Sequence, residues 1–141
     1  MSRVIETSLV IGAPRSSVWS VLMNFDSYPS WNPFIRSIKG SPEVGQTLEV
    51  VIQPPGRKPD VFRPKVIAVD GERRLSWRGS LPIPGLFTGE HSFELRDDGD
   101  GSHFYETFSG LLVPFVGGVL DATEQGFRNM NDALKARAEG R

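Results

Sequence analysis

The segment from Val116 to Ala138 constrains the fold more strongly than any other part of the sequence. A mainly apolar set of side chains recurs there at alternating steps of four and three residues: Val116, Leu120, Thr123, Phe127, Met130 and Leu134. This spacing predicts an α-helix with those residues on one face, and with a polar face of Asp121, Gln125, Asn129, Asp132 and Glu139. Such a helix is stabilised mainly by packing its apolar face against a partner. Because the preceding sequence is mostly typical of β-strands, we predict a curved sheet wrapped around this helix.

Alternation of apolar and polar residues with period two predicts the strands. The first covers Val4–Ile11, and a helix beginning at Pro14 and a second short helical turn before Trp31 follow it. Six further strands form a meander: Ile35–Lys39, Gln46–Gln53, Val61–Val69, Arg74–Ser80, Phe87–Arg96 and His103–Leu112. The dipeptide Asp70-Gly71 predicts a hairpin turn between two of them. Antiparallel strands followed by one covering helix predict an α+β fold, in a single domain of residues 1–141.

Composition and motifs exclude several kinds of site. A net charge of −1 gives no broad attraction to nucleic acid, and the absence of cysteine excludes disulfides and thiolate ligands. There is no GxxxxGK[ST], GxGxxG or GxSxG motif, so we expect no cofactor. His91 and His103 are the only histidines, so no metal site is expected either. Asp97, Asp98 and Asp100 are typical of a solvated turn.

Hydropathy gives no indication of a membrane protein. The longest apolar run, Leu111 to Leu120, is interrupted by Pro114 and is too short to span a bilayer. The first residues, Met1 to Glu6, include charges where a signal peptide has an apolar core. We therefore expect a cytoplasmic protein without membrane insertion and without a nucleic-acid partner.

The most informative titratable residues are His91 and Glu106, on the last two predicted strands. Alternation puts His91 on the same face as Phe93, and Glu106 on the same face as Phe108. Since large aromatic residues mark the buried face, both polar side chains are predicted to point inward, toward the helix.

The length of the last hairpin predicts how close these two residues lie. A turn that pairs Asp97 with Ser102 places His91 opposite Phe108 and makes His91 and Glu106 diagonal neighbours, roughly 7–8 Å apart between backbones. A register slip of one residue would turn both side chains to solvent.

Three interpretations of the pair remain open. A buried carboxyl group must find a partner or keep its proton, and a histidine can be that partner. The pair is then an ion pair that only fixes strand register, an anchor for the polar head of a ligand, or a catalytic acid/base pair.

A cavity between sheet and helix would be lined by adaptable aromatic and sulfur-containing side chains. The candidate ligand-binding residues, in addition to the pair, are Trp31, Asn32, Phe34, Trp77, Phe87, Phe108, Leu120, Phe127 and Met130. Asn32 and Arg78 are candidate polar groups at the rim, although alternation turns Arg78 outward. The apolar segments Leu81–Phe87 and Leu111–Val119 are predicted to form the mouth, with a homodimer contact as the alternative interpretation.

Several motifs together resemble the SRPBCC superfamily, the START-like group with the birch-pollen-allergen or helix-grip fold. They are Ala13-Pro14 with Val18-Trp19, Phe25, Tyr28-Pro29, Trp31 and Pro33-Phe34, then Leu75–Gly79, His91–Leu95, Glu106–Gly110 and Gly126–Lys135. The chain looks most similar to the polyketide cyclase/dehydrase-like branch. This resemblance implies a seven-stranded antiparallel sheet that grips the C-terminal helix around an apolar cavity. It implies no particular chemistry, because the branch contains carriers, sensors and a few enzymes.

Three hypotheses of function follow. The first is binding of a small hydrophobic or amphipathic molecule, such as a lipid, isoprenoid, aromatic compound or polyketide, oriented by His91 and Glu106. The second is an enzyme of the cyclase or dehydratase kind that uses the same pair as base. The third is a protein-interaction or sensor module on the same fold.

Overall fold

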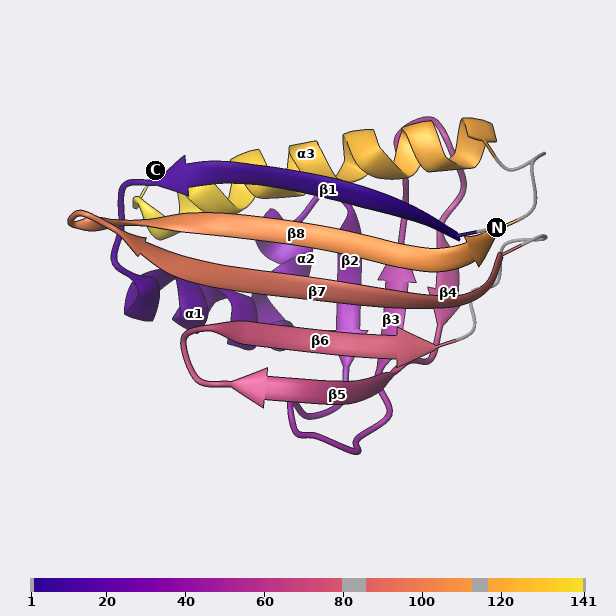
Figure 1. The fold of residues 1–141 in the computed structure, drawn as a ribbon, viewed down its shortest axis with the longest axis horizontal. Coiled ribbons are helices and arrows are strands. Elements are labelled where there is room, and N and C mark those ends of the chain that lie inside the picture. The colour runs from indigo at the N-terminus through magenta and orange to yellow at the C-terminus, as the bar shows by residue number, and fades with distance from the viewer. Residues whose placement is uncertain (1, 80–85, 113–116, 141) are drawn as a thin grey trace.

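The computed structural model describes residues 2–79, 86–112 and 117–140, with side chains described for residues 5–79, 89–109 and 121–140. Figure 1 shows the elements in chain order: β1 (Ser2–Ile11), α1 (Arg15–Met23), a 3₁₀ turn (Phe25–Ser27), α2 (Tyr28–Trp31), β2 (Ile35–Lys39), β3 (Glu49–Ile52), β4 (Asp60–Phe62), β5 (Lys65–Asp70), β6 (Arg74–Gly79), β7 (Leu86–Asp98), β8 (Gly101–Leu112) and α3 (Gly117–Ala138). The predicted α+β class and the order of the elements are confirmed.

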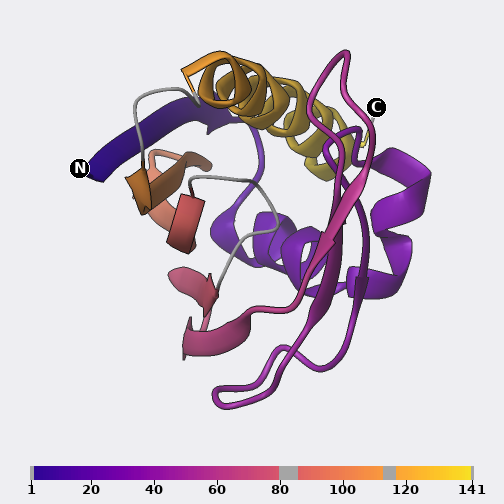
Figure 2. The same cartoon turned by 90° about the vertical axis from the view of Figure 1, so that its right-hand side faces the viewer.

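Two antiparallel sheets form the strand layer of the molecule. The larger sheet has the order β1-β8-β7-β6-β5, and the smaller has the order β2-β3-β4. The strands of the smaller sheet run across those of the larger one, and α3 lies beside β1 (Figure 1, Figure 2). Long-range pairing of β1 with β8 joins the two ends of the chain and closes the fold around a common core.

The expectation of seven strands in one sheet is wrong: the described residues form eight strands in two sheets. The predicted strand Val61–Val69 is interrupted at Pro64, which has no backbone N–H to contribute to a ladder. Before the proline, β4 pairs with β3, and after it β5 pairs with β6. The chain therefore changes sheets at this proline.

Backbone hydrogen bonds around the proline connect the two sheets. The Pro64 carbonyl accepts a bond from Leu48 N at 2.8 Å, and Val66 N donates to the Gln46 carbonyl at 2.9 Å. Because Gln46 and Leu48 are used in this connection, β3 begins at Glu49 and is shorter than the predicted strand Gln46–Gln53.

The turn between β5 and β6 differs from the predicted Asp70-Gly71 hairpin turn. Asp70 pairs with Arg74, so three residues form the loop, and Arg73 N donates to the Asp70 carbonyl at 2.9 Å. Glu72, not Gly71, takes the left-handed conformation, with φ of 60°. Since a side chain is strained there, this turn holds a small amount of backbone strain.

The C-terminal helix α3 packs as its apolar spacing predicts. Phe127, Met130 and Leu134 are at most 1% exposed. Gly126 lies so close to Phe34 that a Cβ atom there would be 2.9 Å from Phe34 Cε1 and closer still to Cδ1. The positions of Val116 and of the Leu120 side chain lie outside the part that the structure describes. In that part, no helix has the length and apolar character needed to cross a membrane.

Candidate functional site

The register of the last hairpin brings the two predicted titratable residues together. In the β7–β8 ladder Asp97 pairs with Ser102, Phe93 with Glu106 and His91 with Phe108, as predicted. His91 is 6% exposed and Glu106 is fully buried. Both side chains therefore point into the core, and the predicted geometry of the pair is confirmed.

The two side chains are hydrogen-bonded to each other. His91 Nε2 lies 2.6 Å from Glu106 Oε2, a distance typical of a charge-assisted bond in which the two groups share one proton. In the structure's described residues, the other ring nitrogen, His91 Nδ1, has no hydrogen-bond partner. The pair thus presents one free nitrogen while its second nitrogen is held by the carboxyl group.

Asn131 on α3 and Thr7 on β1 complete the surroundings of Glu106. The Asn131 amide is assigned so that both its polar atoms are satisfied: its nitrogen donates to Glu106 Oε1 at 2.7 Å and its oxygen accepts from Thr7 Oγ1 at 2.8 Å. Both carboxyl oxygens are then hydrogen-bonded, as a buried carboxyl group requires. Three elements far apart in the sequence therefore hold this one side chain.

Sequence reasoning missed the role of Asn131. It follows Met130 and comes four residues after Phe127, so it lies on the inner face of α3 and is only 3% exposed. A polar residue within an otherwise apolar helix face was the available signal. Thr7, on the inward face of β1 and 3% exposed, was the second.

Aromatic rings surround His91. The Phe127 ring stacks on it with centroids 4.8 Å apart and planes 11° apart. The Phe93 ring lies 4.7 Å from the imidazole, and Trp77, the cross-strand neighbour of His91 on β6, lies at 5.3 Å. These contacts fix the plane of the imidazole ring and keep water away from the His91–Glu106 bond.

Burial controls the electrostatics of the site. It raises the pKa of Glu106, and the hydrogen bond and charge of His91 act in the opposite direction without cancelling the effect of burial. Burial, with a smaller contribution from Glu106, also raises the pKa of the Tyr28 hydroxyl. Tyr28 donates this hydroxyl to the Leu22 carbonyl at 2.7 Å, so it acts as a structural donor.

Most of the predicted lining residues with described side chains lie in the core. Trp77, Phe34, Phe108, Phe127 and Met130 are buried, and the Phe34 ring packs against Phe127 at 5.5 Å, on the ring that stacks on His91. These residues and the pair therefore form one continuous cluster.

Trp31 and Asn32 occupy different positions from those predicted. Trp31 is half-buried, packs on Tyr28 and donates its indole N–H to Ser27 Oγ. Asn32 is 1% exposed, so the prediction of a rim position is wrong. Its Oδ1 accepts from the backbone N–H groups of Phe34 and Ile35, because it caps the turn that leads into β2.

Other candidates lie outside the cluster or outside the described residues. Arg78 is exposed and pairs with Glu90 on the outer face of the sheet, as alternation predicts. The side chains of Phe87 and Leu120, and most of the predicted mouth segments, are not among the described residues. The ends of β6 and β8 and the starts of β7 and α3 lie at one end of the molecule (Figure 1).

Two buried donors have no protein acceptor. Trp77 Nε1 and Asn32 Nδ2 are fully buried and make no hydrogen bond with the described residues. Each residue as a whole is only 1% exposed. An unpaired buried donor is costly, so both atoms are exceptions that call for an explanation.

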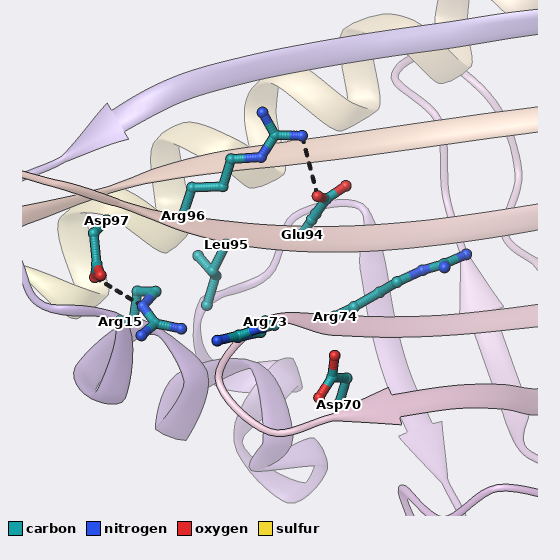
Figure 3. Close-up of a pocket in the computed structure, with 8 residues that line it drawn as sticks. All are labelled: Arg15, Asp70, Arg73, Arg74, Glu94, Leu95, Arg96 and Asp97. Atoms are coloured by element: carbon teal, nitrogen blue, oxygen red, sulfur yellow. Dashed lines mark hydrogen bonds and ion pairs between the residues drawn. The ribbon is translucent and has the colours of Figure 1, made fainter.

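The hollows lined wholly by described residues are at the surface. One, of about 450 Å³, lies between α1 and the β5–β6 and β7–β8 turns (Figure 3), and is lined by Arg15, Asp70, Arg73, Arg74, Glu94, Leu95, Arg96 and Asp97. Arg15 pairs with Asp97 at 2.8 Å and Arg96 with Glu94 at 3.2 Å. Because its charges are largely paired and exposed, this groove has no strong preference for an anion.

A second hollow lies at the β2–β3 edge, and neither hollow includes His91 or Glu106. The predicted cavity between sheet and α3 is bordered by residues 80–88 and 110–120, whose side chains the structure does not describe. That cavity stays a prediction.

Comparison with solved structures shows which fold this arrangement has. ZhuI aromatase/cyclase from Streptomyces sp. R1128 superposes with a TM-score of 0.83 at 16% identity, over 99% of this chain and 94% of that one. Ara h 8.0201 gives a TM-score of 0.79 at 16% identity over 100% of both chains. Norcoclaurine synthase from Thalictrum flavum gives a TM-score of 0.74 at 18% identity, over 99% and 96%. At these identities the likeness shows a common fold and leaves the chemistry open.

Comparison of the sequence with known families gives the relationship itself. The search of curated proteins gave no match. The family described as polyketide cyclase / dehydrase and lipid transport matches residues 2–139, nearly the whole chain. The chain therefore belongs to this family and has the helix-grip fold of the START-like SRPBCC superfamily.

Proposed function

We propose that this protein binds a small hydrophobic or amphipathic molecule between the larger sheet and α3, with the polar group of that molecule hydrogen-bonded to His91. The observation that carries the proposal is the hydrogen-bonded His91–Glu106 pair inside an aromatic cluster. The family description, which joins cyclase or dehydrase activity with lipid transport, supports ligand binding in general terms.

A structural ion pair accounts for only part of this geometry. Fixing strand register needs one contact between β7 and β8, and the backbone ladder already supplies it. The remaining ring nitrogen, His91 Nδ1, is left without a partner among the described residues. A ligand with one polar group would satisfy Nδ1 and place its apolar body against Trp77 and Phe127.

Native mass spectrometry of the gently purified protein tests this function, followed by titration with a panel of apolar and amphipathic compounds. We expect at least one compound to bind in a 1:1 complex. Failure of the whole panel, with no adduct on the purified chain, would contradict the proposal.

A matched pair of histidine variants tests the anchoring role. His91→Phe keeps the aromatic packing but removes Nδ1, and is expected to weaken binding of an amphipathic ligand about tenfold, the value of one hydrogen bond to a polar group. His103→Phe changes the chain's other histidine, which stacks on Tyr105, and serves as the control. Equal losses in both variants would mean that His91 does not contact the ligand.

A second function, cyclisation of a substrate with several ketone groups, is favoured by one feature of the pair. Glu106 holds Nε2, so His91 Nδ1 is oriented as a base, as in pairs where a carboxyl group positions a catalytic histidine. His91 would take a proton from a carbon between two carbonyl groups, and the enolate carbon would attack a third carbonyl. The resulting alkoxide would recover the proton from His91.

Glu106→Gln separates these two functions. The amide keeps a hydrogen bond to His91 but cannot hold a proton or balance a charge on the ring. We expect ligand binding within about threefold of the wild type and, if the protein is a cyclase, a loss of turnover of about 10²-fold or more. Unchanged turnover of a true substrate would exclude the catalytic role. The expected cytoplasmic location and the homodimer stay predictions.

A further inference from the structure

Trp77 Nε1 and Asn32 Nδ2 are both hydrogen-bond donors, and both lie in the aromatic cluster around His91. Trp77 packs directly on His91, with centroids 5.3 Å apart. Asn32 caps Phe34 N, and the Phe34 ring packs on Phe127, which in turn stacks on His91. Neither donor has an acceptor among the described residues, although the neighbouring Asn32 Oδ1 is fully used.

Other buried polar groups nearby do have partners. Thr7 and Asn131 bond to each other and to Glu106, Ser102 Oγ donates to the Ala13 carbonyl, and Ser76 Oγ lies 2.7 Å from Ser92 Oγ. The two unpaired donors are therefore not part of a generally poorly satisfied core. Buried donors without acceptors are rare in folded proteins, because each costs the full desolvation of an N–H group.

The charges of the cluster restrict what the acceptor can be. Among the described residues, the buried polar and charged side chains are Thr7, Asn32, Ser76, His91, Ser102, Glu106 and Asn131, with no lysine or arginine. Any positive charge on His91 is balanced by Glu106, to which it is bonded. A carboxylate or phosphate brought into this cluster would have no free counter-charge, and Glu106 would repel it.

We propose that Trp77 Nε1 and Asn32 Nδ2 form a binding subsite for neutral oxygen acceptors, so that the ligand is an uncharged carbonyl compound, such as a ketone or ester, and not a carboxylate. This inference rests on the proposed function, because it requires that a ligand enters the space beside His91. It adds the chemical class of the ligand and assigns two specificity-determining residues that the His91–Glu106 pair does not include.

Three tricyclic probes of nearly equal size test the subsite: fluorene, 9-fluorenone and fluorene-9-carboxylate. Each is titrated into the full chain by calorimetry and into ¹⁵N-labelled protein by NMR. The three tryptophans give three indole N–H signals. We expect 9-fluorenone to bind about tenfold more tightly than fluorene, the value of one added hydrogen bond. We expect the carboxylate to bind most weakly, and the Trp77 indole proton to shift downfield with 9-fluorenone alone.

Variants assign the effect to the two donors. Trp77→Phe removes one donor, and Trp31→Phe is the matched control because the Trp31 indole already donates to Ser27 Oγ. Asn32→Asp keeps the oxygen that caps Phe34 and Ile35 but removes the amide donor, so it tests the subsite even if Trp77→Phe fails to fold. We expect the preference for 9-fluorenone over fluorene to fall in both subsite variants and to persist in Trp31→Phe.

The outcomes distinguish the inference from the function on which it rests. Equal binding of fluorene and 9-fluorenone, with an unmoved Trp77 signal, would overturn the subsite and leave ligand binding intact. Tightest binding of the carboxylate would overturn the choice of a neutral ligand. Binding of none of the probes, nor of any compound in the wider panel, would contradict the proposed function and the subsite together.

Discussion

Glu106 is the residue at which burial and ionisation oppose each other most strongly. Its carboxyl group is fully buried, bonded to His91 and Asn131, and its pKa is raised by burial. A raised pKa in the folded state means that the folded protein holds this proton to higher pH than the unfolded chain. The contribution to stability is therefore complete below the ordinary pKa and is lost as the pH rises through the folded value.

This sign gives a prediction for Glu106→Gln, whose amide does not titrate. The free energy of unfolding of the wild type, minus that of the variant, is expected to fall as the pH rises above 4.5, the ordinary pKa of the group. Urea unfolding between pH 4 and pH 8 measures the difference. Glu94→Gln, which removes an exposed charge on β7, controls for net charge. A difference that grows with pH would show that the carboxyl pKa is lowered instead.

Glu72 supplies a second prediction at the scale of one residue. Its φ of 60° is costly for a side chain, whereas asparagine and glycine tolerate it. Glu72→Asn and Glu72→Gly are expected to raise the free energy of unfolding by about 0.5–1 kcal/mol. Glu72→Ala keeps the strain and should give no gain. A gain of equal size in all three variants would trace the effect to the lost charge and not to the backbone.

The helix α3 is the element whose packing depends on a single glycine. Gly126 faces Phe34, and an added Cβ atom would overlap that ring, lying 2.9 Å from Cε1 and closer still to Cδ1. Alanine favours a helix by about 1 kcal/mol over glycine, but overpacking against a buried ring costs about 1–3 kcal/mol. The Phe34 ring in turn supports Phe127, which stacks on His91. The packing cost is therefore expected to decide the outcome.

We predict that Gly126→Ala lowers the free energy of unfolding by about 1–2 kcal/mol and weakens ligand binding as well. Thermal and urea unfolding measure the first effect. Gly71→Ala is the control, because a Cβ atom added there would meet no atom within 4 Å and the φ of Gly71 is not positive. Stabilisation by Gly126→Ala would show that Phe34 moves aside freely and does not support the site.

Element boundaries followed the sequence where one local rule applied. The β7–β8 register was predictable because the turn from Asp97 to Ser102 and the alternation of aromatic residues agree. The exchange of sheets at Pro64 was not predicted, because the residues around it continue the apolar alternation. The missing N–H of that proline was the physical signal for two strands instead of one.

The site was predictable from sequence only in part, because its members act across the whole molecule. Facing strands within one hairpin brought His91 and Glu106 together, and this required local register alone. Asn131 reaches Glu106 from α3 and Thr7 from β1, through contacts that depend on how the helix docks. Likewise, the burial of Asn32 follows from the packing of its turn against the core, which its polarity did not indicate.

At the scale of the molecule, two sheets and one helix surround a cluster in which polar groups are held among aromatic rings. The His91–Glu106 pair, the unpaired donors of Trp77 and Asn32, and the family relationship all concern this one region. The groove in Figure 3 is, by contrast, exposed and internally paired in charge. The interior therefore holds the function that we propose.

A crystal structure of the protein with 9-fluorenone tests this account most directly. We predict density for the compound beside Phe127, with its carbonyl oxygen within hydrogen-bond distance of His91 Nδ1, Trp77 Nε1 or Asn32 Nδ2. Density on the outer surface only, with side chains filling all the space around His91, would contradict it.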